Sequence, residues 1–233
     1  MSGGPRPVVL VAGSPGSGAR GADPILAAAL AAAGRPRPSV AYIGVASDDD
    51  RDFLRFVTAY LQRAGAGEVR LAALASARAD LAAARAVIER SDVVFVSGGD
   101  VEAGMTHLEK RGLLPLLRTL HGAGTPFIGL SAGSIMLARC WVRWSDPDDD
   151  ATAETFPCLA LAPILCDCHA EGDDWEELRA LLALTGEGVG YGIPAGGALR
   201  VDPRGAVAAL GKPAQRFECR RGRVETPTEL TPA

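Results

Sequence analysis

A buried strand that turns abruptly into a helix most constrains how this chain can fold. The apolar residues 125–128 are followed at once by the sequence GLSAG at residues 129–133. So tight a reversal needs glycine on both sides of its apex, because a Cβ atom there would collide with the strand. The apical Ser131 is then exposed at a helix N-terminus, where free N–H groups and the helix dipole stabilise an oxyanion. This pattern makes Ser131 a candidate nucleophile on a nucleophile elbow, although the string also arises by chance.

Strands and helices alternate along the chain before this turn. Apolar runs predict strands at residues 7–12, 39–44, 68–72 and 92–97, and helical spacing predicts helices at residues 24–33, 51–64, 80–90, 101–111 and 113–121. This order predicts an α/β fold with a mostly parallel sheet and helices on both faces. Ligands of such sheets bind beyond the carboxyl ends of the strands, where Gly99 and Ser131 both fall.

The pattern changes after a helix expected over residues 133–141. The sequence then predicts an acidic loop at residues 144–150, a strand at 159–166, a helix from Asp173 to Gly186, and short strands at 189–193, 198–202, 206–210 and 216–219. Their hairpin-like spacing favours antiparallel strands added near the C-terminus at one edge of the sheet. We therefore expect one α/β domain over residues 1–225 and a loose tail over 226–233.

Composition narrows the classes of function. Of the 233 residues, 48% are hydrophobic, which is enough for a full core, and the net charge of −4 without a Lys/Arg run argues against nucleic acid or anionic membrane as a partner. No apolar run approaches the roughly 20 residues of a membrane span. The glycine-rich residues 13–18 lack a phosphate-loop ending and are expected to form a flexible loop. Five cysteines, an odd number, suit a reducing compartment, so a cytoplasmic location is expected.

A nucleophilic serine needs an imidazole base that is oriented by a carboxylate. Of the three histidines, two lie among leucines on predicted helices, whereas His169 follows a predicted strand and precedes a helix. A side chain in that position can reach the end of a neighbouring strand. The residue that supplies the acid is not fixed by the sequence. The candidates are Asp146, Asp167, Glu154 and Glu171.

Five segments together resemble the serine peptidase family of dipeptidase E and cyanophycinase. They are SGGD at 97–100, GLSAGS at 129–134, SDP at 145–147, CDCHAEGDDWEELRALL from Cys166, and GYGIPAGGAL from Gly190. The resemblance extends from the first strand to about Leu210. It implies a class I glutamine amidotransferase-like fold in which serine replaces the amidotransferase cysteine.

The resemblance also implies roles for single residues. Ser131 resembles the nucleophile of the family and His169 its general base, while Asp146 resembles the acid of the triad. The N–H groups of Gly99 and Ala132 resemble the two donors of the oxyanion hole.

Two positions depart from the family pattern and concern substrate recognition. Related sequences carry an asparagine after the elbow where this chain has Ser134 and Ile135, and an acidic IDEG pattern where it has IPAG at residues 193–196. These differences argue against an N-terminal-aspartate dipeptide as the substrate. Candidate substrate-binding residues are Asp100, Ser134, Arg139 and Arg143. Arg179 also lies near the expected site, and the acidic residues 148–150 could instead favour a basic substrate.

Two other classes of function compete with the hydrolase. Cys158, Cys166, Cys168 and His169 are candidate metal ligands, but C-x-C-H lacks the paired spacing of a zinc site, so no metal or cofactor is expected. A non-catalytic binding module that kept the fold is the alternative function. The sequence favours a serine-type peptidase, dipeptidase or isopeptidase that acts on a small peptide or cyanophycin-like substrate through an acyl-enzyme. The protein could also form a homodimer.

Overall fold

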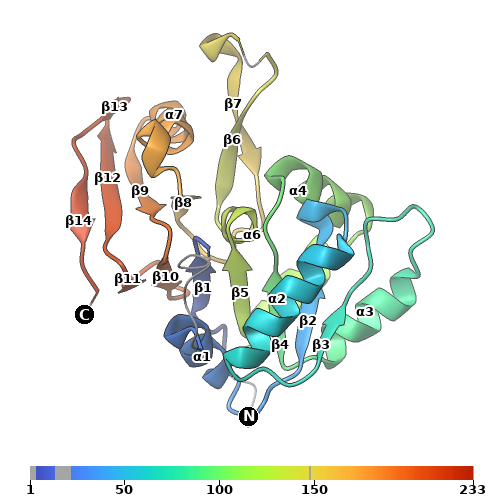
Figure 1. The fold of residues 1–233 in the computed structure, drawn as a ribbon. Helices are drawn as coiled ribbons and strands as arrows, with labels where there is room; N and C mark the ends of the chain where they lie inside the picture. Colours follow the sequence, from blue (N-terminus) through green and yellow to red (C-terminus); the bar gives the residue numbers. More distant parts are fainter. Residues whose placement is uncertain (1–3, 14–21, 147, 233) are drawn as a thin grey trace.

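The computed structural model describes residues 4–13, 22–146 and 148–232, and its main element is a seven-stranded sheet (Figure 1). The strand order is β11-β10-β1-β5-β4-β2-β3. The bounds are β1 Val8–Val11, β2 Val40–Ile43, β3 Val69–Leu71, β4 Val93–Val96, β5 Phe127–Leu130, β10 Gly197–Val201 and β11 Val207–Gly211. Strands β1 to β5 are parallel, and β10 and β11 add antiparallel strands beside β1. The predicted fold class is thereby confirmed.

Helices cover both faces of this sheet because its strands are apolar on both sides. In β1, Val8 and Leu10 join one core cluster, whereas Val9 and Val11 join the other. Helices α1 (Pro24–Ala31) and α2 (Arg51–Arg63) cover the Val9 face. The opposite face is covered by α3 (Leu81–Arg90), α4 (Val101–Lys110), α5 (Leu114–Gly122) and α6 (Ala132–Leu137). Short 3-10 turns lie at Val45–Ser47, Asp150–Thr152 and Glu171–Asp173.

Other C-terminal strands form a second sheet rather than extending the first. It consists of β8 (Leu165–Cys168), β9 (Gly188–Ile193), β12 (Ala214–Arg220), β13 (Arg223–Val224) and β14 (Thr228–Leu230). The expectation that all these segments join one edge of the main sheet was wrong, because helix α7 (Glu176–Thr185) packs its leucines against β8 and β12 and gives them a separate core. The expected loose tail over 226–233 contains β14, which pairs with β12.

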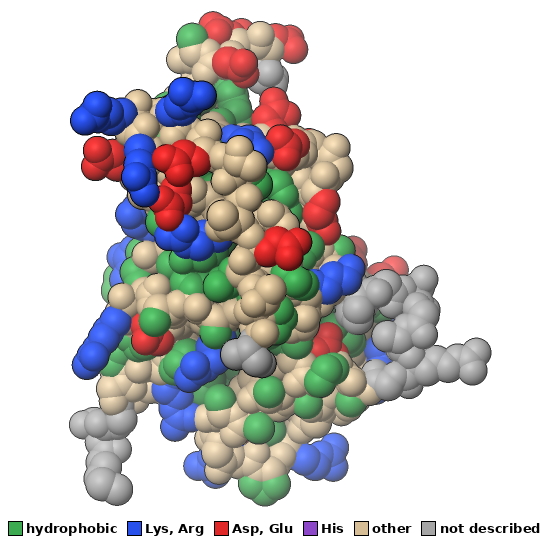
Figure 2. Space-filling model, turned by 90° about the vertical axis from the view of Figure 1, so that its left-hand side faces the viewer, with side chains coloured by type: hydrophobic (Ala, Val, Ile, Leu, Met, Phe, Trp, Pro, Cys, Tyr) green, Lys and Arg blue, Asp and Glu red, His purple; other side chains and the backbone are tan. Residues whose placement is uncertain are grey.

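The segment after the elbow also differs from its prediction. Helix α6 ends at Leu137, and β6 (Cys140–Trp144) and β7 (Ala153–Pro157) form a hairpin where a longer helix and an acidic loop were expected. Residues 159–162, expected as a strand, instead donate backbone hydrogen bonds to carbonyls at the end of α6. This tertiary pairing satisfies the last carbonyls of the helix and stops it. The acidic side chains of the hairpin tip gather at the top of the molecule (Figure 2).

In the part of the chain that the structure describes, no helix is long and apolar enough to cross a membrane. All five cysteines are free thiols, and four of them are buried. Of the glycine-rich loop expected at 13–18, residues 14–18 lie outside the described residues.

Candidate active site

Ser131 stands at the apex of a tight turn between β5 and α6. Its backbone has φ 53° and ψ −122°, and its N–H donates to the Val11 carbonyl at 2.8 Å. Both flanking glycines are required by close approach: a Cβ atom on Gly129 would lie 2.6 Å from the Ser134 Cα, and one on Gly133 would lie 2.1 Å from the Val96 carbonyl oxygen. The structure therefore contains a tight, glycine-flanked turn from strand to helix with Ser131 at its apex.

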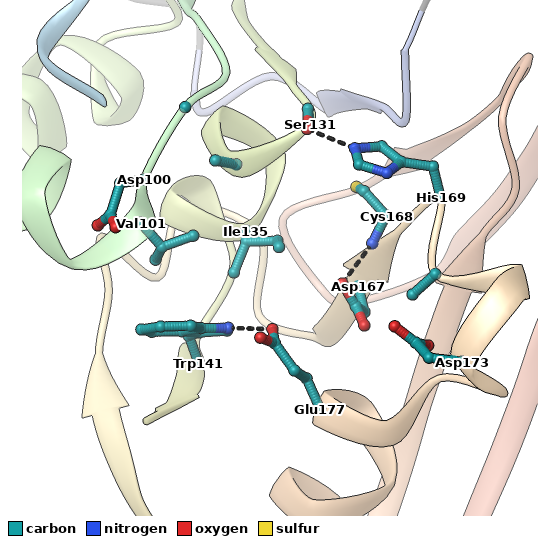
Figure 3. Close-up of a pocket in the computed structure, with 13 residues that line it drawn as sticks. Asp100, Val101, Ser131, Ile135, Trp141, Asp167, Cys168, His169, Asp173 and Glu177 are labelled. Atoms are coloured by element: carbon teal, nitrogen blue, oxygen red, sulfur yellow. Dashed lines mark hydrogen bonds between the residues drawn. The ribbon is translucent and has the colours of Figure 1, made fainter. Parts of the chain in front are cut away.

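His169 reaches Ser131 from the second sheet. It follows the end of β8, where its backbone has φ 48° and its N–H donates to the Ile193 carbonyl at 2.8 Å. The His169 Nε2 and Ser131 Oγ atoms are 2.6 Å apart (Figure 3). At this distance the imidazole can accept the proton of the hydroxyl, as nucleophilic catalysis requires.

The other two histidines lie elsewhere, as their sequence context indicated. His107 is on α4, with its Nε2 3.6 Å from Asp48. His121 is buried on α5, with its Nε2 2.9 Å from the Arg6 carbonyl oxygen.

Gly99 and Ala132 line the same pocket as Ser131 and His169. Gly99 follows β4 with φ 142°, and a Cβ atom on it would lie 1.9 Å from the Ala46 carbonyl oxygen. Ala132 is the first residue of α6, so its N–H has no acceptor within the helix. The structure thus places both residues at the pocket that holds the serine.

The structure does not bring the preferred acid, Asp146, to His169. Asp146 lies in the β6–β7 loop, where its N–H donates to Thr152 Oγ1 at 3.1 Å and its Oδ1 accepts from the Asp148 N–H at 3.1 Å. Among the described residues, His169 forms no hydrogen bond or ion pair with any carboxylate. The separation follows from the early end of α6, which places residue 146 on a projecting hairpin (Figure 1).

The alternative acids occupy three different environments. Glu154 forms an ion pair with Arg143 at 2.7 Å. Glu171 accepts a hydrogen bond from the Ala195 N–H at 2.8 Å, at the turn after β9. Asp167 lines the pocket and is 6% exposed.

The environment of Asp167 is unusual. Its Oδ1 accepts from the Cys168 N–H at 2.7 Å, while its Oδ2 is buried without a hydrogen-bond partner. Burial raises the pKa of the Asp167 carboxyl to about 7; the backbone hydrogen bond opposes this shift, and the charges of Glu177 and Asp173 add to it. Asp167 therefore keeps its proton far more readily than an exposed aspartate.

Most candidate substrate-binding residues lie away from the pocket. Asp100 lines it and caps α4 by accepting from the Ala103 N–H at 2.7 Å. Ser134 is completely buried and donates to the Val11 carbonyl at 3.0 Å, so its hydroxyl belongs to the packing of α6 on the sheet. Arg139 is exposed and is not among the pocket-lining residues. Arg143 is held between Glu102 and Glu154 and lies over the Phe156 ring.

The pocket has a volume of about 310 Å³, and sequence reasoning missed three of the polar side chains that line it. These are Trp141, Asp173 and Glu177. Trp141 lies in a segment whose sequence predicts the end of a helix, and the acids of residues 173–177 fit the start of a helix. Within the described ranges, no group of three or more His, Cys, Asp or Glu side chains could hold a metal ion.

Comparison with known proteins identifies a family and similar structures. The sequence model of Peptidase family S51 matches residues 8–208. Peptidase E of Pasteurella multocida (strain Pm70) is 29% identical over 171 residues, which cover 70% of this chain and 69% of that protein. A peptidase from an acI-B1 actinobacterium has a similar structure, with a TM-score of 0.75 at 14% identity, over 100% of this chain and 97% of that one. A Listeria monocytogenes EGD-e protein described as a candidate Peptidase E aligns with a TM-score of 0.64 at 16% identity, over 89% and 98% of the two chains.

Proposed function

Because this chain belongs to peptidase family S51, a family of serine peptidases, we propose that Ser131 and His169 cleave a peptide or isopeptide bond through an acyl-enzyme. The observation that carries this proposal is the 2.6 Å hydrogen bond between Ser131 Oγ and His169 Nε2 at the apex of a glycine-flanked turn. The same pair is the nucleophile and base that the sequence predicts.

In the first step, Ser131 Oγ attacks the carbonyl carbon and its proton moves to His169 Nε2. The negative charge that develops on the carbonyl oxygen accepts hydrogen bonds from the N–H groups of Gly99 and Ala132. The carbon–nitrogen bond then breaks, and the leaving amine takes the proton from His169. A water molecule that His169 deprotonates hydrolyses the ester and restores the serine.

We propose Glu171 as the acid that orients His169. Two contacts support this choice: the His169 N–H donates to the Ile193 carbonyl, and Glu171 Oε1 accepts from the Ala195 N–H, so both residues are tied to the same turn after β9. This is the turn where related sequences carry the acidic IDEG pattern that this chain lacks. Glu171 supplies a carboxylate to that turn from another segment.

The substrate proposed for this site is a small peptide. A pocket of about 310 Å³ is at the small end of the range of ligand sites and accommodates a few residues rather than a folded protein.

A fluorophosphonate probe tests the assignment of the nucleophile directly. We expect the folded protein to be labelled on Ser131, as located by peptide mass spectrometry, and the Ser131→Ala variant to remain unlabelled. The His169→Gln variant should label far more slowly, because the serine loses its base. Ser134→Ala is the matched control, since its hydroxyl is buried in α6, and it should label at the normal rate. Absence of label on Ser131 in folded protein would contradict the proposal.

A further inference from the structure

Beside the Ser131–His169 pair, one part of the pocket gathers acidic side chains. The carboxylates of Asp167, Asp173 and Glu177 lie in the same part of the pocket (Figure 3). The charges of Asp173 and Glu177 act on Asp167 and disfavour its ionised form. Among the residues that the structure describes, no Lys or Arg lines this pocket. These acids therefore have no Lys or Arg partner among the described residues that line the pocket.

The nearby arginines are engaged outside this pocket. Arg179 pairs with Asp174 at 3.0 Å and lies over the ring of Phe217. Arg143 pairs with Glu102 at 2.6 Å. Neither guanidinium forms an ion pair with Asp167, Asp173 or Glu177 in the part of the chain that the structure describes.

Asp167 points independently to a missing hydrogen-bond donor. It is 6% exposed, and its Oδ2 is buried without a partner although the residue lines the pocket. A buried carboxylate oxygen without a donor is costly and is therefore uncommon in folded proteins. A ligand that donates a hydrogen bond to Oδ2 would remove that cost.

The Glu177 carboxylate is fixed by one hydrogen bond and has a second oxygen available to a ligand. Its Oε2 accepts a hydrogen bond from the Trp141 indole N–H at 2.6 Å, and its Oε1 forms no hydrogen bond within the described chain. The Trp141 ring also lines the pocket. An aromatic ring next to a carboxylate is a favourable environment for an organic cation.

We propose that Asp167, Asp173 and Glu177 form a subsite for a protonated amine or guanidinium group of the substrate. This inference rests on the proposed function, because the group is carried by the peptide whose bond Ser131 attacks. Carboxylates bind ammonium and guanidinium groups through charge-assisted hydrogen bonds. An aspartate side chain would be repelled from the same place.

The cation could belong to a Lys or Arg side chain or to a free α-amino group, and four ligands separate these sources. Nα-acetyl-lysine amide carries only the side-chain ammonium, and norleucine amide carries only the α-ammonium. Nα-acetyl-norleucine amide carries neither, and Nα-acetyl-aspartate amide carries a negative charge. Titration calorimetry of the Ser131→Ala protein with each ligand measures binding without catalysis.

We expect at least one cationic ligand to bind about tenfold or more tightly than Nα-acetyl-norleucine amide, which is the scale of one charge pair in a partly buried site. In the same background, at a pH of about 8, above the pKa of about 7 of the Asp167 carboxyl, Glu177→Gln and Asp167→Asn should each remove most of this preference. Gln keeps an acceptor for Trp141, so Glu177→Gln changes the charge with little change in packing. Glu176→Gln is the matched control on the same helix turn, because Glu176 is exposed and lies outside this pocket, and it should bind normally.

Equal binding of all four ligands, no binding of either cationic ligand at millimolar concentration, or preferred binding of the aspartate ligand would overturn the inference. A preference that survives Glu177→Gln and Asp167→Asn would do so as well. None of these results bears on the nucleophile, because Ser131 is absent from the protein used. The fluorophosphonate experiment decides that question separately.

Discussion

Ser131 and His169 are joined by a 2.6 Å hydrogen bond, and each holds its backbone at a positive φ, 53° and 48° respectively. Residues with a Cβ atom seldom adopt such angles, and the strain costs on the order of 1–3 kcal/mol each. Both residues sit directly after the end of a strand, β5 and β8. The turns that bring the two side chains together are therefore less stable than ordinary turns.

Because of this strain, we expect that replacing Ser131 by glycine stabilises the fold while it abolishes activity. Ser131→Gly should raise the free energy of unfolding by about 1 kcal/mol relative to Ser131→Ala, because glycine adopts the observed φ and ψ without strain. Both variants should lose peptidase activity. Urea denaturation of the two proteins, side by side, measures the difference. If the alanine variant is the more stable, the elbow is not strained.

The acid that supports His169 can be identified by comparing two isosteric variants. Glu171→Gln should lower kcat about 10- to 100-fold, less than the loss seen for a fully buried triad acid, because Glu171 is exposed. Asp146→Asn should change kcat less than twofold, since Asp146 bonds only within its hairpin loop among the described residues. Steady-state rates on one small peptide, with fluorophosphonate labelling as a second readout, measure both. The reverse order of effects would show that the β6–β7 hairpin approaches His169 during turnover.

A site residue could be predicted from the sequence where its position depends on neighbouring residues in the chain, and could not where it depends on contacts between distant segments. Ser131 and Gly99 could be placed at the same edge of the sheet because each lies where an apolar strand ends beside glycine, a pattern within a few residues. Ala132, and the oxyanion-hole roles of Gly99 and Ala132, were implied only by the resemblance to the family. The position of Asp146 could not be predicted from the sequence, because residues 159–162 end helix α6 through hydrogen bonds between distant segments. The burial of Asp167 likewise results from tertiary packing, which cannot be predicted from the spacing of residues in the sequence.

The parallel sheet was predictable for a similar reason. Strands such as β4 are apolar on every residue and are followed by capped helices, so periodicity alone identifies them. The division of the C-terminal strands into two sheets was not predictable, because short strands carry no signal of which neighbour they pair with. That choice is made by α7, which gives β8 and β12 a core of their own.

The glycines of the elbow give a test of close packing between β4 and α6. Gly133→Ala should lower the free energy of unfolding by about 3 kcal/mol or more, because the new Cβ would lie 2.1 Å from the Val96 carbonyl oxygen and neither backbone can move easily. Activity should fall as well, since a displaced β4 also moves Gly99.

Gly122→Ala is the control for this variant. Gly122 ends helix α5, and a Cβ atom there has no neighbour within 4 Å. Its stability should be equal to that of the unaltered protein or slightly higher, as expected for alanine in a helix. Thermal unfolding of the two variants measures the contrast, and equal melting temperatures would contradict the packing described for the elbow.

Asp167 predicts how stability depends on pH. Burial raises the pKa of its carboxyl from 3.8 to about 7 in the folded protein, with Glu177 and Asp173 facing it. Between these values the folded protein retains a proton that the unfolded chain has lost, so this group's stabilising contribution is complete below about pH 4 and is lost as the pH rises through about 7. The loss should amount to a few kcal/mol in the free energy of unfolding.

Asp167→Asn isolates that contribution, because asparagine cannot ionise and keeps an acceptor for the Cys168 N–H. The difference in stability between Asp167→Asn and the unaltered protein should therefore grow in favour of the variant as the pH is raised from about 4 to about 8. Chemical denaturation across this range measures it, and Asp174→Asn, whose side chain is exposed outside the pocket, should run parallel to the unaltered protein. A pH-independent difference for Asp167→Asn would mean that Asp167 is ionised in the folded protein, and that its buried Oδ2 already has a donor.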